Sequence, residues 1–189
     1  SGDWSSDVCS SDLFRDTMVD LIVDETALTA ADIKVMGNTG FIDSKNPTSG
    51  DKVFIYMVVP ASASATDSAA ASTAVLNKVE EENILGIFCS NEGTVKGLLA
   101  ATNDGADFAT KYKDVVVVGF DAGAAQKAAV RSEYFLGSIT QDPFSIGYLA
   151  VELAYKAYMG EAVADVDTGA KFYDKDNMDD ADIEGLIYD

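Results

Sequence analysis

Histidine is absent from this chain of 189 residues, which also has only two cysteines and 13 basic residues against 32 acidic ones. Without histidine there is no imidazole base and no histidine-containing zinc site. Cys9 and Cys89 are too few for a metal cluster or a disulfide framework, and Cys89 lies in an apolar run that is typical of a buried strand. Because no catalytic triad, metal-ligand set or nucleotide-binding glycine loop is present either, we predict no enzyme activity, no metal and no cofactor.

The net charge of −19 excludes a further class of partners. Nucleic acid and anionic membrane surfaces both require a basic face, so neither is expected as a partner. No run of 18 apolar residues occurs, and therefore no membrane-spanning segment is predicted. A composition with 48 % hydrophobic and 24 % charged residues is typical of a soluble globular domain.

The first 13 residues, SGDWSSDVCSSDL, have neither helical nor strand periodicity and lack the basic and apolar regions of a signal peptide. Residues 3–13 resemble one reading frame of a common short-read sequencing adapter, which would make them non-native. The alternative is a disordered tail. Under both interpretations residues 1–13 are left out of the fold, and the missing export signal says nothing about location.

Three apolar segments in the second half of the chain each lead through a short polar residue into a helical pattern. This alternation predicts a parallel sheet with right-handed crossovers, and the near-continuous apolar strands predict helices on both of its faces. We therefore expect an α/β fold with a doubly wound, mostly parallel sheet. The strands are predicted at 84–90, 115–120 and 134–140, and the polar residues that follow them are Asn91, Asp121 and Gln141.

Four segments follow from this pattern. Residues 1–13 form the tail, 14–50 a helix and an irregular segment with one short strand near 33–36, 51–172 the α/β lobe, and 173–189 an acidic C-terminal tail. Residues 52–59 are predicted to be the first strand of the lobe. Asp67 is the expected N-cap of its first helix, and the Asp142-Pro143 pair is a strong start signal for its last one, which we expect to bury Ile146, Leu149, Ala150, Leu153 and Ala157 and to end at Gly160.

Parallel strands bring their carboxyl ends to one edge of the sheet, where open α/β folds bind ligands. An amide, a carboxylate and a second amide at that edge suit a neutral, hydroxyl-rich molecule, because they supply donors and acceptors but no reactive nucleophile. Each residue also has a purely structural interpretation. Asn91 and Asp121 are candidate caps of the helices that follow them, and Gln141 is a candidate exposed loop residue.

The motifs GIFCSNEGT, VVVVGFDAG and LGSITQDPFSIGYLAVE together resemble the C-terminal lobe of ribose-type periplasmic sugar-binding proteins. The segment DTGAKFYDKDNMDDADI is similar to the ends of such proteins. This resemblance covers residues 52–189 and, less closely, 14–25. It implies one lobe of a two-lobed protein that binds a monosaccharide, a pentose or a hexose, and delivers it to an ABC permease. Nearly all of the N-terminal lobe would then be missing.

The resemblance also assigns site residues. It implies that Asn91, Asp121 and Gln141 contact sugar hydroxyls and that Arg15, on the first helix, donates to the sugar as well. One departure is that residues 61–71 contain no aromatic side chain to stack on a sugar ring. The family further implies a monomer in an extracytoplasmic location, periplasmic or lipid-anchored. The alternative is the effector-binding domain of a lac-repressor-type, sugar-responsive transcription regulator.

Three other features of the sequence have structural interpretations. The aspartates of 174–182 suggest calcium, but EF-hand spacing is absent, so a solvated, turn-rich tail is expected. Glu92 is expected to point away from Asn91. Four phenylalanines are interpreted as core residues, and for one of them, Phe144, a role in stacking on a ligand is left open. The four are Phe88, Phe120, Phe135 and Phe144.

Overall fold

The computed structural model describes residues 10–37, 42 and 45–187, and the chain divides into two compact units, 1–62 and 63–189. Each unit combines parallel strands with helices. The predicted α/β class with mostly parallel strands is therefore confirmed.

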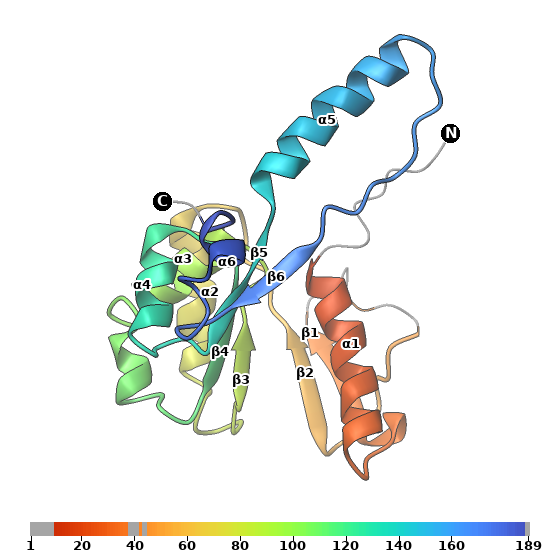
Figure 1. Ribbon diagram of the computed structural model, residues 1–189. Helices are drawn as coiled ribbons and strands as arrows, with labels where there is room; N and C mark the ends of the chain where they lie inside the picture. The colour runs from red at the N-terminus through yellow and green to blue at the C-terminus, as the bar shows by residue number, and fades with distance from the viewer. Residues whose placement is uncertain (1–9, 38–41, 43–44, 188–189) are drawn as a thin grey trace. The chain divides into compact units, whose positions relative to one another are not determined.

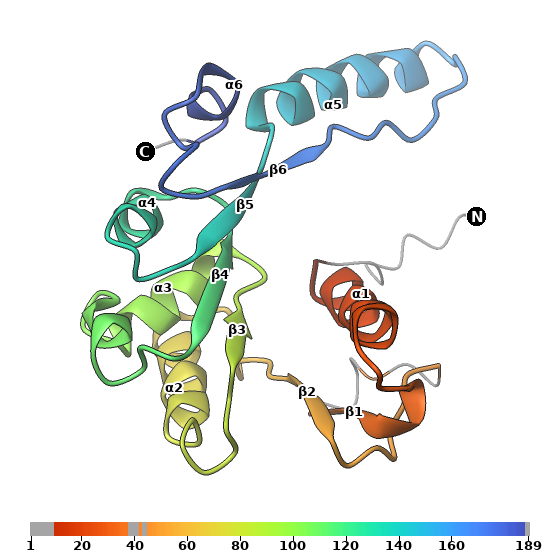
Figure 2. The same cartoon turned by 60° about the horizontal axis from the view of Figure 1, so that its bottom comes forward.

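The first unit consists of helix α1 (Ser10–Glu25), the short helix η1 (Ala30–Asp32) and the parallel strands β1 (Ile33–Gly37) and β2 (Val53–Met57). Figure 2 shows α1 lying alongside this strand pair. Apolar side chains from the helix and both strands form one core: Met18, Val19, Ile22, Val23, Ile33, Val35, Ile55 and Met57. The predicted short strand near 33–36 is confirmed. Helix α1 begins at Ser10, inside the predicted tail; the tail's residues 1–9, with Trp4 and Cys9, lie outside the described residues.

The assignment of residues 52–59 to the main sheet is wrong. Strand β2 pairs with β1, in a register that runs from Ile33 opposite Val53 to Gly37 opposite Met57. Its inward residues Ile55 and Met57 are buried, whereas its outward residues Phe54 and Tyr56 are about half exposed. The apolar run correctly indicated a strand, but nothing in it indicated which neighbour the strand pairs with.

The second unit contains a four-stranded sheet in the order β3-β4-β5-β6 (Figure 1). Strands β3 (Gly86–Phe88), β4 (Val116–Phe120) and β5 (Gly137–Gln141) run parallel, as predicted from their apolar sequences. The last strand, β6 (Ala170–Tyr173), pairs antiparallel with β5. The three parallel strands therefore end at one edge of the sheet.

Helices α2 (Ala65–Leu76), α3 (Glu92–Ala100) and α4 (Ala124–Arg131) gather on one side of this sheet (Figure 1). They enclose the main core, which includes Leu76, Val95, Leu98, Val117, Val130 and Phe135. Gly97 lets α3 approach α2 closely, since a Cβ there would lie 2.6 Å from Ser68.

The cap of α2 is Ser64, whose hydroxyl accepts the Asp67 amide at 3.1 Å, so the prediction of Asp67 as the cap is wrong. The opposite face of the sheet carries Val116 and Phe172, which are 51 % and 42 % exposed.

Helix α5 (Pro143–Tyr158) begins and ends as predicted. Asp142 caps it by accepting the Ser145 amide at 2.9 Å, Pro143 occupies its first turn, and Gly160 follows it with a φ of +77°. The expectation that one of its faces is buried is wrong, because no residue of α5 is buried. Among the described residues, no helix is both long and apolar enough to cross a membrane.

The C-terminal segment is more ordered than a solvated tail. Tyr173, Met178 and Ile183 are buried in the main core, and a short helix α6 (Ala181–Glu184) follows. Arg131 of α4 forms an ion pair with Asp179. The expectation of a solvated tail is therefore wrong for these residues, whose apolar members are too widely spaced among aspartates to stand out in the sequence.

Candidate functional site

Asn91, Asp121 and Gln141 follow, or end, three neighbouring strands. Asn91 comes three residues after β3, Asp121 directly follows β4, and Gln141 is the last residue of β5. Because these strands are parallel and adjacent in the order β3-β4-β5, the three residues lie at the same edge of the sheet, with Asp121 in the middle. We call this set the rim triad.

Asn91 is the N-cap of α3, as its structural interpretation predicted. Its Oδ1 accepts the Thr94 amide at 2.9 Å, and the Thr94 hydroxyl accepts the Asn91 amide at 3.3 Å. The side chain is exposed, and its Nδ2 forms no hydrogen bond within the described part of the chain. Capping uses only the oxygen of the amide, so the nitrogen remains a donor at the rim.

Asp121 does not cap the helix that follows it, because the N-cap of α4 is Gly123. Its Oδ2 instead accepts the backbone amide of Glu92, the first residue of α3, at 3.1 Å. A carboxylate is favoured at this position by the partial positive charge of a helix N-terminus. The contact brings Asp121 next to Asn91, although the two are 30 residues apart in the sequence, and Asp121 Oδ1 makes no hydrogen bond to the described residues.

The backbone of Asp121 has a φ of +74°, in the left-handed region. Its amide donates to Ile139 O at 2.7 Å and extends the β4–β5 pairing by one residue. Its carbonyl oxygen accepts from Gln126 Nε2 at 2.9 Å and from the Ser138 and Tyr173 hydroxyls at 3.0 Å each. All three donor residues are buried. Apolar strand patterns gave no indication of this arrangement; its only sequence signal is a polar residue, Ser138, at an inward position of β5.

Gln141 is exposed at the end of β5, where its backbone pairs with Ala170 of β6. No side-chain hydrogen bond of Gln141 is found among the described residues, and its neighbour Asp142 is engaged in capping α5. Ser145 accordingly holds the pKa of Asp142 below its ordinary value by hydrogen bonding through its side chain and its amide. The Gln141 amide therefore keeps both its donors and its acceptor at the rim.

Arg15 belongs to the first unit, whereas the rim triad belongs to the second. Its side chain is buried, and its Nε donates to Asp16 Oδ1 at 2.7 Å. The Asp16 carboxylate also accepts from Asn46 at 3.1 Å, and the pKa of Asp16 is lowered, chiefly by Arg15. A role for Arg15 in ligand binding stays a prediction.

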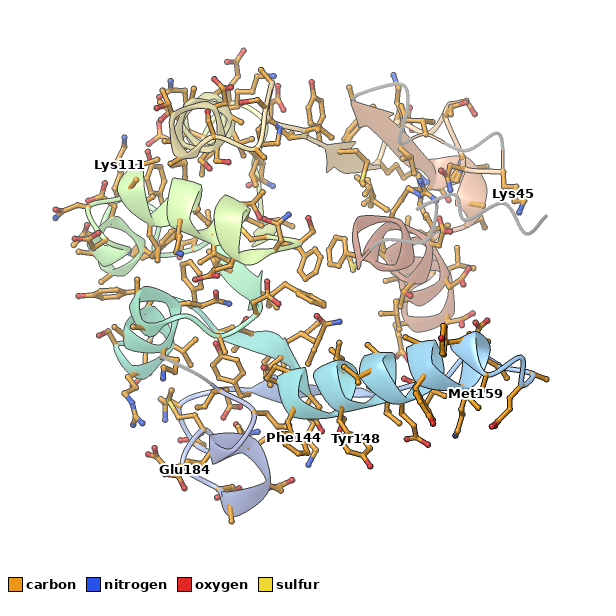
Figure 3. All side chains as sticks on the ribbon, turned by 90° about the horizontal axis from the view of Figure 1, so that it is seen from above. Lys45, Lys111, Phe144, Tyr148, Met159 and Glu184 are labelled. Carbon is orange, nitrogen blue, oxygen red and sulfur yellow. The ribbon has the colours of Figure 1, made fainter. Side chains whose placement is uncertain are left out.

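The phenylalanines divide by position. Of the four phenylalanines interpreted as core, Phe135 is buried there, while Phe88 and Phe120 are half-buried, so that interpretation is correct for Phe135 alone. Phe144, at the start of α5, is 79 % exposed and stacks on Tyr148 with ring centroids 6.3 Å apart. Figure 3 shows these two rings on the same side of the helix.

Two ionisable side chains lie beside the rim triad, the Cys89 thiol and the Glu92 carboxylate. The Cys89 thiol, two residues before Asn91, is buried, and burial raises its pKa to about 12, so it is protonated at neutral pH. Glu92 pairs with Lys96 at 2.7 Å and covers Gly123, in agreement with the expectation that it points away from Asn91. Within the described residues, no group of His, Cys, Asp or Glu is arranged to hold a metal ion.

The described residues also form a cavity of about 250 Å³ beside β6, lined by Asp142, Thr168, Gly169, Ala170, Lys171, Asp182 and Leu186. None of the rim triad lines it. A second, much smaller space of about 10 Å³ lies between Glu92 and Gln126.

The sequence of residues 28–162 matches the model of a periplasmic binding protein domain. The chain belongs to this family. No curated protein matches it significantly. Among solved structures, an "ABC transporter, LacI family transcriptional regulator" from Brachyspira murdochii is 31 % identical, with a TM-score of 0.61 over 95 % of this chain and 64 % of that one.

Two further solved structures of the periplasmic binding protein type are similar. A carbohydrate transporter solute-binding protein from Agrobacterium radiobacter, in complex with D-arabinose, is 27 % identical, with a TM-score of 0.61 over 95 % of this chain and 62 % of that one. A solute-binding protein from Agrobacterium vitis with bound D-fucose is 19 % identical, with a TM-score of 0.62, and shares the fold. The chain spans less than two thirds of the length of each of these proteins.

Proposed function

We propose that this chain is the ligand-contacting lobe of a solute-binding protein that captures a monosaccharide for an ABC permease. The observation that carries the proposal is the contact between Asp121 Oδ2 and the amide of Glu92, which brings Asp121 beside Asn91 at the carboxyl edge of the sheet. Solved relatives with D-arabinose or D-fucose bound support a sugar as the ligand.

The rim triad supplies the chemistry that a sugar needs. Each sugar hydroxyl both donates and accepts, and the triad offers a donor on Asn91, an anionic acceptor on Asp121 and an amide with both functions on Gln141. Hydrogen bonds to a charged group contribute about 1.5–3 kcal/mol, against about 1 kcal/mol for neutral pairs, so Asp121 is expected to contribute most of the affinity from this lobe. Once closure of the protein around the sugar buries these groups, an epimer would leave one of them unpaired, which gives selectivity.

We propose further that a second lobe completes the site. The relatives are about half as long again as this chain, which supports additional structure in the complete protein. Helix α5 supports it too. Phe144, Val151 and Tyr158 recur every seven residues, so they lie on one face of the helix, and they are 79 %, 72 % and 86 % exposed. A contiguous exposed apolar face of this kind is typical of an interaction surface. The second lobe would provide the ring stacking that residues 61–71 lack. Within this chain, the exposed Phe144 is the other candidate for that stacking.

Transport follows from closure of the two lobes around the sugar. A ligand shifts an open–closed equilibrium only through contacts that exist in the closed state, and hydroxyls that bond to both lobes supply such contacts. The permease would bind the closed form. In this proposal the protein is a non-catalytic, extracytoplasmic monomer, either periplasmic or held by a lipid anchor.

The test is calorimetry of the complete gene product against a panel of pentoses and hexoses, after a thermal-shift screen. Saturable binding of one sugar is expected, and no binding across the panel would refute the proposal. The 189-residue chain alone is expected to bind the same sugar poorly. Saturable binding to it at millimolar concentration or better would contradict the need for a second lobe.

The alternative is the sugar-sensing domain of a lac-repressor-type regulator, and the description of the Brachyspira murdochii relative names both classes. The net charge of −19 disfavours DNA as a partner of this chain. The upstream gene sequence discriminates between them: a signal peptide with a lipidation cysteine supports transport, and a helix-turn-helix segment supports the regulator.

A further inference from the structure

Asp121 is held in a backbone conformation that a residue with a side chain rarely adopts. Its φ of +74° lies in the left-handed region. A non-glycine residue is strained there, and it keeps this conformation only if its surroundings hold it in place. Asp121 is also the central member of the rim triad. The groups that fix its backbone therefore control where its carboxylate lies.

Three buried side chains from three different elements converge on the Asp121 carbonyl oxygen. Gln126 of α4 donates at 2.9 Å, and Ser138 of β5 and Tyr173 of β6 donate at 3.0 Å. Each of these side chains is no more than 1 % exposed. A carbonyl oxygen has two lone pairs, so three donors are more than it needs for satisfaction, and the peptide after Asp121 is fixed from three directions.

The Gln126 amide supports a specific purpose for this arrangement. Its Nε2 donates to the carbonyls of both Phe120 and Asp121 and contacts the Ser138 hydroxyl, which sets the orientation of the amide. Its Oε1 is then buried with no donor among the described residues. An unsatisfied buried acceptor is destabilising, so a leucine would serve the core better. What the glutamine adds is a pair of hydrogen bonds to two successive backbone carbonyls, those of Phe120 and Asp121.

We propose that Gln126, Ser138 and Tyr173 are positioning residues, which hold the Asp121 carboxylate at the N-terminus of α3 and in reach of the ligand. The ligand part of this inference rests on the proposed function, whereas the positioning part does not. It predicts that loss of one donor displaces the carboxylate, lengthens its contact with the Glu92 amide and weakens sugar binding without unfolding the protein.

The first test is hydrogen exchange on the 189-residue chain, and it needs no ligand. The Glu92 amide donates to Asp121, while the nearby Thr94 amide donates to Asn91, so Thr94 is an internal control. In Tyr173→Phe, exchange of the Glu92 amide is expected to accelerate about three- to tenfold, the equivalent of one lost hydrogen bond, with Thr94 unchanged. No change at Glu92, or equal acceleration at both amides, would overturn the inference.

The matched control variant is Tyr134→Phe. Tyr134 packs against the same core, but its hydroxyl makes no hydrogen bond to the described residues, so this variant should leave both amides as they are. Ser138→Ala, which removes another donor to Asp121, should reproduce the effect of Tyr173→Phe. A response in Tyr134→Phe as large as that in Tyr173→Phe would assign the effect to general loosening of the core.

The second test is sugar affinity of the complete protein in a double-mutant cycle. Tyr173→Phe is expected to weaken binding about three- to tenfold, and to have no further effect once Asp121 is alanine, because it acts through that carboxylate. An equal loss in both backgrounds would refute the coupling. If the wild-type protein binds no sugar, the proposed function fails, and hydrogen exchange at Glu92 still decides the positioning role.

Discussion

Asp121 combines two functions that substitution can separate, since its carboxylate both accepts the Glu92 amide and, in the proposed function, accepts sugar hydroxyls. Asp121→Asn keeps an oxygen for the amide and keeps a residue type that tolerates a positive φ, but it removes the charge. Asp121→Ala removes the acceptor altogether and leaves an alanine at a φ of +74°. Both variants should therefore weaken binding, Asp121→Ala more than Asp121→Asn, and they should differ in their effects on folding.

The magnitudes follow from the contacts of Asp121. Asp121→Asn exchanges a charged for a neutral acceptor, a difference of about 0.5–2 kcal/mol that corresponds to a loss of about two- to thirtyfold in sugar affinity. Its effect on the free energy of unfolding should stay near 0.5 kcal/mol, the typical worth of a charge at a helix N-terminus. Asp121→Ala should lower the free energy of unfolding by about 1–2 kcal/mol, because the Glu92 amide loses its acceptor.

The assays are calorimetric titration of the complete protein and urea unfolding of the 189-residue chain, with each variant beside the wild type. An Asp121→Asn variant that binds sugar as tightly as the wild type would refute the anionic acceptor. An Asp121→Ala variant as resistant to urea as the wild type would refute the helix contact. Unfolding of both variants would assign Asp121 to structure and remove the basis for its role in binding.

Three further predictions concern parts of the chain away from the rim. Gly97→Ala should lower the free energy of unfolding in urea by about 1–3 kcal/mol, since its Cβ meets the backbone of α2 at 2.6 Å, whereas Gly147→Ala, with open space around it, should not destabilise. Lys52 holds the pKa of Asp32 at about 2, against an ordinary 3.8; their pair is therefore intact above pH 3.8 and lost as the pH falls through 2. NMR titration should find that midpoint, and Lys52→Met should raise it; an unchanged midpoint would exclude the ion pair as its cause. Cys89 should resist iodoacetamide at pH 8 in the folded protein, as judged by mass spectrometry of its peptide, and rapid alkylation would show that the thiol is accessible.

The sequence predicted those features that depend on neighbours along the chain. Asp142 and Pro143 determine the start of α5 through a side-chain cap and a fixed φ, both of which are local. The β4 and β5 runs are apolar enough to need a sheet, and the polar residues after them had to lie at its edge. Parallel pairing alone brings the ends of these strands to one edge of the sheet, so the sequence predicted that the rim triad shares an edge but not which contacts its members make.

Features that depend on distant partners were not predictable in the same way. An apolar run such as 53–57 indicates a strand but carries no record of its neighbour, and β2 pairs with β1. Asp121 looked like a cap for the next helix, because capping is usually local, but its acceptor meets α3 instead. Helix α5 has apolar residues that predict burial, but none of its residues is buried by the part of the chain that the structure describes. In each case the outcome depends on a partner that is distant in the sequence.

The contact between Gln126 and Asp121 depends on a small residue, Gly119, whose role is not evident in the sequence. Gly119 precedes Asp121 by two positions in β4, and a Cβ there would lie 2.5 Å from Gln126 Nε2 and 3.0 Å from Ser138 Oγ. In the sequence this glycine only weakens a strand of valines. In the fold it provides the space in which the Gln126 amide lies across β4 and reaches the carbonyls of the turn. The strained conformation of Asp121 thus depends on a glycine and a glutamine that lie outside the rim triad.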